Sequence, residues 1–114
     1  PSNSSAASDV YKRQGLGRMS GIQYTVKTTS RFRKDFKLAR RRGLDAGLFK
    51  QVVSILSEGG TLPDRYHDHA LTGNMTGFRE CHITPDLLLV YLIEKDVLVL
   101  TLTRTGTHSD LFGK

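Results

Sequence analysis

Four histidines are the residues of this sequence best suited to chemistry, and all lie in the C-terminal half of the chain: His67, His69, His82 and His108. Two carboxylates and two arginines lie close to them in the sequence: Asp68, Asp86, Arg79 and Arg104. An imidazole with its ordinary pKa of about 6.5 takes up and gives back protons near neutral pH. Such a set therefore favours acid–base catalysis.

Three interpretations of the histidines stay open at this level. In the first, His82 is a hydrogen-bonded core residue and the others are exposed loop residues. In the second, a metal is held by His67, His69, Cys81 and His82, although this spacing matches no structural zinc motif. In the third, the histidines catalyse proton transfer without a metal.

Positive charge is concentrated in one short part of the chain. Residues 27–50 hold nine Lys or Arg and two Asp, a net charge of +7, whereas residues 51–114 hold five basic and eight acidic residues, a net −3. A solvated helix face is one explanation. The other is a contact with nucleic acid, because such a dense cluster repels itself unless a polyanion is near. The basic residues assigned to this contact are Arg33, Lys34, Lys37, Arg40, Arg41 and the more distant Arg79.

Together, the histidines and the basic segment point to RNA cleavage. RNA carries its own nucleophile, the 2′-OH, so a protein has to supply a base, an acid and cations around the phosphorus. Histidine, aspartate and arginine provide these groups.

The elements that position these residues follow from the hydrophobic pattern. Apolar and polar residues alternate over 22–28, which predicts a strand. Two helices are expected next, the first from an N-cap at Ser30 to Gly43 and the second over residues 45–58. The inner face of the second helix is expected to hold Leu48, Val52, Ile55 and Leu56. A loop is expected over 61–77, and three strands over 78–83, 87–93 and 97–104, before a tail. Residues 87–93 have no polar alternation, which predicts a central strand.

This order, β-α-α-β-β-β, predicts an α+β domain with a helical hairpin packed on a small antiparallel sheet. In such a meander, His82, Asp86, Arg104 and His108 are expected to converge at one edge of the sheet, within reach of His69 from the loop.

Length and composition are those of one soluble domain. The chain has 114 residues and a net charge of +6, and its lone cysteine excludes an internal disulfide and suits a reducing, cytoplasmic compartment. Residues 1–18 are polar and aperiodic, and we expect them to be a disordered, non-native leader. The predicted domain is then residues 19–114, with Met19 as the native start. No membrane span is expected.

Two sequence blocks carry a family resemblance. YHDHALTGNMTGFRECHITPDLLLVY (66–91) and LTRTGTHSDLF (102–112) resemble the YafQ-like branch of the RelE/ParE toxin superfamily, over a region from about Tyr24 to the C-terminus. The resemblance implies a RelE-like fold and a toxin of a type II toxin–antitoxin pair that cleaves mRNA in the ribosomal A site. From the histidine set itself we expect no cofactor and no metal. As partners the resemblance implies mRNA, the ribosome and a cognate antitoxin, with a monomer when free and a hetero-oligomer with the antitoxin.

The resemblance also implies roles for individual residues. His108 would be the general acid, and either Asp86 or His82 the base. His69 would orient the substrate, Arg104 would stabilise the phosphorane, and Phe112 would stack on a base. Leu87 and Met75 occupy positions where relatives often have tryptophan, which points to a different codon preference. A non-enzymatic ParE-like toxin, or a domain that only binds RNA or a partner, is the alternative.

Overall fold

The structure is a computed structural model and describes residues 22–113, so the predictions for residues 1–18 lie outside the described residues. Its strands and helices follow in chain order: β1 (Thr25–Thr28), α2 (Ser30–Arg41), α3 (Ala46–Ser57), β2 (His69–Ala70), β3 (Arg79–Thr84), β4 (Leu87–Glu94), β5 (Val99–Gly106) and α4 (His108–Phe112). Two 3-10 turns, η2 (Asp64–Tyr66) and η3 (Gly73–Met75), flank β2.

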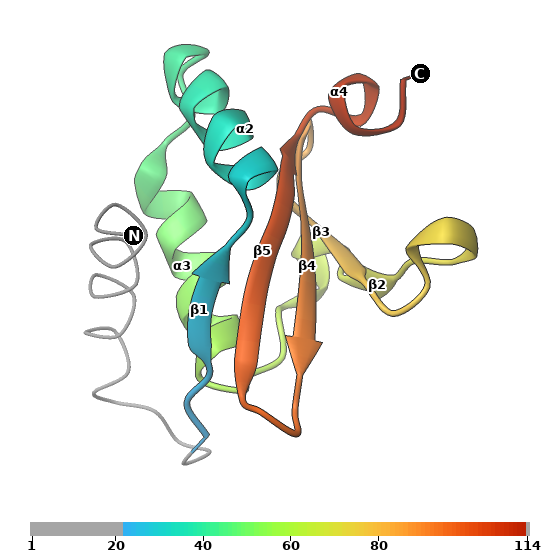
Figure 1. Cartoon of the computed structure of the whole chain (residues 1–114). Coiled ribbons are helices and arrows are strands. Elements are labelled where there is room, and N and C mark those ends of the chain that lie inside the picture. The colour runs from blue at the N-terminus through green and yellow to red at the C-terminus, as the bar shows by residue number, and fades with distance from the viewer. Residues whose placement is uncertain (1–21, 114) are drawn as a thin grey trace.

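The five strands form one sheet in the order β1-β5-β4-β3-β2 (Figure 1). The α+β class is confirmed, but the expectation of a purely antiparallel sheet needs correction because β1 pairs with β5 in parallel. The reason lies in the connection: β1 and β5 are distant in sequence, and the chain between them crosses the helices before it returns, which permits a parallel pair. The sheet is therefore mixed, with β1 at one edge and β2 at the other.

Helices α2 and α3 form the expected hairpin (Figure 1). The N-cap of α2 is Thr29 and not Ser30, because the Thr29 hydroxyl accepts the backbone N–H of Phe32 at 2.9 Å. Asp45 caps α3 in the same way through the N–H of Gly47 at 2.8 Å. Between the helices, Gly43 has a φ of +101°, which a residue with a side chain rarely adopts.

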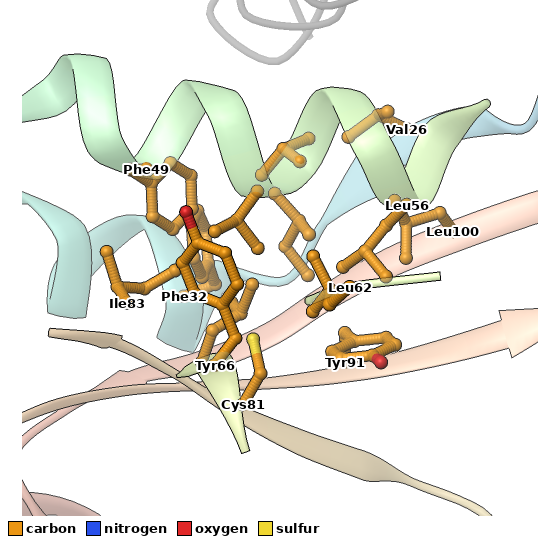
Figure 2. Close-up of a cluster of buried hydrophobic side chains, with 14 of the residues drawn as sticks. Val26, Phe32, Phe49, Leu56, Leu62, Tyr66, Cys81, Ile83, Tyr91 and Leu100 are labelled. Carbon is orange, nitrogen blue, oxygen red and sulfur yellow. The ribbon is translucent and has the colours of Figure 1, made fainter. Parts of the chain in front are cut away.

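The core lies between this hairpin and the sheet (Figure 2). Aromatic rings of the two helices pack together, with centroids 5.6 Å apart for Phe32 and Phe49 and 5.0 Å for Phe36 and Phe49. Strand β4 is central, and residues 88–91 are all buried, as the sequence predicted. The inner face of α3 is rotated from the predicted one, so that Phe49 is buried and Leu48 is exposed.

Two segments predicted as irregular contain structure. The loop over 61–77 includes β2, which pairs with β3, and the tail includes α4. Helix α4 begins with a capping box between Thr107 and Asp110. A helix of five residues has no room for hydrophobic periodicity, which explains why the pattern did not predict it. Within residues 22–113, none of the helices has the length and apolar character needed to span a membrane.

Candidate active site

A cleft of about 440 Å³ lies where β3 ends and α4 begins. Its lining includes three of the predicted catalytic residues, His82, Asp86 and His108. The remaining lining residues are Glu80, Pro85, Leu88, Thr107 and Ser109. The structure therefore brings together a histidine from a strand, an aspartate from the following turn and a histidine from the C-terminal helix.

Strand alternation explains the contribution of β3. Successive side chains of a strand point to opposite faces of the sheet. Cys81 and Ile83 belong to the core cluster beneath the helices, so Glu80 and His82 face the other side, where the cleft lies. Helix α4 contributes His108 as its first residue, and the Phe112 ring packs 5.0 Å from the His108 ring. Phe112 does not line the cleft itself, but it packs against His108, which does.

The loop histidines reach this side of the sheet from β2 and the turn before it. The rings of His67 and His82 meet edge to face, with centroids 5.4 Å apart. His69 lies opposite Glu80 in the β2–β3 ladder, and its Nε2 is 3.2 Å from Oε1 of Glu80. Its Nδ1 is 2.7 Å from the carbonyl oxygen of His67. Since a carbonyl only accepts, Nδ1 of His69 carries a proton, and the contact between Nε2 and Glu80 needs a second proton on one of the two groups.

Glu80 is the cleft residue that sequence reasoning missed. It is only 6% exposed, and its Oε2 has no hydrogen-bond partner among the described residues. A buried carboxylate oxygen without a donor is costly, and such groups are found where a ligand or a reaction makes use of them. The available signal was its position two residues before His82 on a strand, which places both side chains on one face.

Arg104 is near the cleft but is held by another residue. It lines a neighbouring cavity of about 420 Å³ between α2, β5 and α4, which shares Asp86 and Thr107 with the cleft. Its Nε and Nη2 donate to the Asp35 carboxylate at 2.7 and 3.2 Å, and this contact raises the pKa of Arg104. Asp35 therefore fixes the orientation of the guanidinium, in a cavity that Asp86 also lines.

Arg79 does not line the cleft and does not belong to the surface of α2. Its guanidinium pairs with Asp68 at 3.0 Å, and this contact raises its pKa. Asp68 also accepts a short hydrogen bond from the hydroxyl of the buried Tyr91. The structure thus separates Arg79 from the other five residues predicted to bind RNA.

Those five residues form an exposed basic face on α2, which comprises Arg33, Lys34, Lys37, Arg40 and Arg41. Phe32 and Ala39 of the same helix are buried, so the charged side chains stand on the outer side. Arg40 also lies 6.0 Å from the centre of the Phe36 ring.

The metal arrangement considered from the sequence is not formed. The Cys81 side chain is fully buried in the core, on the face of β3 opposite His82, and burial raises the pKa of its thiol to about 12. In the part of the chain from 22 to 113, no group of three or more His, Cys, Asp or Glu side chains is placed to hold a metal ion.

Residues 24–113 match the family model described as a bacterial toxin of a type II toxin–antitoxin system, YafQ. This chain belongs to the YafQ family. The assignment made from the two sequence blocks is confirmed. The predicted endoribonuclease activity agrees with the name of an E. coli relative, an mRNA interferase toxin.

Relatives and solved structures agree with this assignment. The mRNA interferase toxin YafQ of Escherichia coli K12 is 37% identical over 93 residues, which cover 81% of this chain and 99% of the relative. A crystal structure of a metal-bound toxin from Helicobacter pylori is 43% identical and covers 80% of this chain and all of the other, with a TM-score of 0.74. In the crystal structure of the E. coli DinJ–YafQ toxin–antitoxin complex, the matching chain is 36% identical to this one. The match covers 81% of this chain and all of that chain, with a TM-score of 0.73.

Proposed function

We propose that this YafQ family member is an mRNA interferase that cleaves mRNA on the ribosome, in the cytoplasm, by acid–base catalysis in the cleft. The observation that carries the proposal is that His82, Asp86 and His108, from three separate segments, line one cleft. The name of the E. coli relative supports mRNA as the substrate.

The cleft residues supply the groups that cleavage by the 2′-OH requires. His82 or Asp86 removes the 2′ proton, and O2′ attacks the phosphorus as the bond from phosphorus to O5′ breaks. His108 donates a proton to the departing O5′, which leaves a 2′,3′-cyclic phosphate and a 5′-OH. Each positioned proton-transfer group contributes about 10²–10⁴ in rate.

The other predicted site residues, His69, Phe112 and Arg104, do not line the cleft and are proposed to act from beside it. His69 orients the substrate beside Glu80, and Phe112 stacks on a base next to His108. Arg104 keeps its predicted role of stabilising charge on the phosphorus, which requires the guanidinium to act while it is bonded to Asp35.

The basic face of α2 is proposed to bind ribosomal RNA through phosphate contacts. A protein antitoxin is the proposed inhibitor, since the related E. coli toxin is found in complex with DinJ. In this proposal the chain is a monomer when free and a hetero-oligomer with its antitoxin.

Induced expression in bacteria, combined with cleavage mapping in a translating extract, tests the proposal. Wild type should arrest growth and cut mRNA, whereas His82→Ala and His108→Ala should keep their folded circular dichroism spectrum and lose both effects. Variants as toxic as wild type would contradict the catalytic assignment. Loss of cleavage on addition of a chelator would contradict the metal-free mechanism.

A further inference from the structure

Asp68 lies between His67 and His69 and is bonded to two neighbouring strands. Its carboxylate accepts from Nε and Nη2 of Arg79 on β3, at 3.3 and 3.0 Å. It also accepts from the hydroxyl of Tyr91 on β4. Tyr91 is 1% exposed and belongs to the core cluster (Figure 2). Three donors from the sheet therefore hold one side chain of the segment that carries both loop histidines.

Asp68 and His69 point to opposite faces of the sheet. Asp68 reaches the face that carries Tyr91, where the core lies. His69 contacts Glu80, whose side chain lines the cleft on the other face. Because side chains alternate along an extended chain, the face that Asp68 occupies decides the face that His69 occupies.

The backbone pairing of β2 with β3 is too short to fix by itself which face His69 occupies. The strand has two residues, paired as His69 with Glu80 and Ala70 with Arg79, and one more backbone bond runs from Leu71 to Phe78 at 2.9 Å. A shift of one residue would send the His69 ring away from the cleft. The hydrogen bonds to Asp68 oppose such a shift because they can form in only one register of β2.

We propose that Asp68, Arg79 and Tyr91 form an anchor that sets the register of β2 and so positions the His69 imidazole against Glu80. The proposal rests on the proposed function for the role of His69. It makes Arg79 a positioning residue that acts through His69, and not an RNA contact.

The two roles of Arg79 predict different kinetics. If Arg79 positions His69, Arg79→Gln and Asp68→Asn each lower kcat by about tenfold to a hundredfold, with KM nearly unchanged. The double variant then loses about as much as the worse single variant, because both changes break one contact. Arg65→Gln removes the same charge from η2, where the guanidinium contacts Tyr66, and should leave kcat within about twofold.

If Arg79 instead binds RNA, Arg79→Gln raises KM and reduces the salt dependence of binding, and Asp68→Asn leaves kcat unchanged. That pattern would overturn the proposal. Tyr91→Phe keeps the buried ring and removes only the hydroxyl donor, so it tests the anchor even if a polar variant fails to fold. It should lower kcat by a smaller factor, and an unchanged kcat would count against the anchor.

Imidazole ¹⁵N chemical shifts of His69 give a readout that does not depend on cleavage. In wild type they should show Nδ1 protonated, as the contact with the His67 carbonyl requires. In Asp68→Asn and Arg79→Gln they should show a mixture of tautomers. Unchanged His69 chemical shifts in both variants would contradict the proposal of an anchor. Absence of RNA cleavage by wild type would contradict the proposed function, but the chemical shifts would still test the anchor.

Discussion

Nε2 of His69 lies 3.2 Å from Oε1 of Glu80, across the short ladder between β2 and β3. The other ring nitrogen is committed to the His67 carbonyl, so His69 and Glu80 share one further proton. The second oxygen of Glu80 is buried without a donor in the described structure. The pair therefore places a proton acceptor in the wall of the cleft that contains His82 and His108.

Glu80→Gln should lower kcat by about tenfold to a hundredfold, because it keeps the shape of the side chain and removes the carboxylate that holds the His69 ring in place. Single-turnover cleavage rates measure this effect. Glu94→Gln, an equal change of charge at the exposed end of β4, serves as the matched control and should cleave at the wild-type rate. Wild-type cleavage by Glu80→Gln would mean that the carboxylate has no part in catalysis.

Arg40→Gln and Arg41→Gln should each weaken ribosome binding and reduce the slope of log affinity against log salt concentration by about one. The reason is that each loses one phosphate contact and the counterions released with it. Binding titrations over a range of salt concentrations check this. Lys95→Gln, at the exposed turn between β4 and β5, is the control for loss of one charge. An unchanged slope for both arginine variants would exclude the basic face as the docking surface.

The carboxyl group of Asp110 should titrate below its ordinary pKa of 3.8. Its pKa is lowered first by the backbone N–H of Thr107 and then by the Arg42 guanidinium, 2.8 Å away. A lowered pKa means that the ionised form stabilises the fold, so this contribution is present above about pH 4 and is lost as the pH falls through the lowered pKa.

Carboxyl NMR titrations of wild type and Arg42→Gln check the prediction for Asp110. In the variant the pKa should rise but stay below the ordinary value, because the bond from Thr107 remains. An ordinary pKa in wild type would show that the capping box at the start of α4 does not form in solution.

Cys81 should be inert towards iodoacetamide in the folded protein at about pH 8 and react once the protein is denatured. The thiol is fully buried, and desolvation raises its pKa to about 12, so almost no thiolate forms. Mass spectrometry of the alkylated protein measures the outcome. Rapid labelling without denaturant would show that β3 opens readily.

Local patterns in the sequence determined most of the fold. Phe32 and Ala39 recur at helical spacing and are buried, and residues 87–93 form a central strand because they lack polar alternation. Such patterns depend only on which face of an element is apolar. They do not indicate how distant strands pair, so the parallel contact between β1 and β5 was not predicted.

The sequence by itself determined the family and the residue types of the site, because both reside in local order: the histidines, the Pro-Asp turn and the Arg-Thr-Gly-Thr-His block. Only the tertiary structure decided which of these side chains meet. It placed His82, Asp86 and His108 in one cleft, added Glu80, and bound Arg79 to Asp68 and Arg104 to Asp35. The physical reason is that an ion pair or a shared cleft depends on distances between segments far apart in the sequence, such as Asp35 and Arg104, which are 69 residues apart. Strand register and helix packing set these distances together.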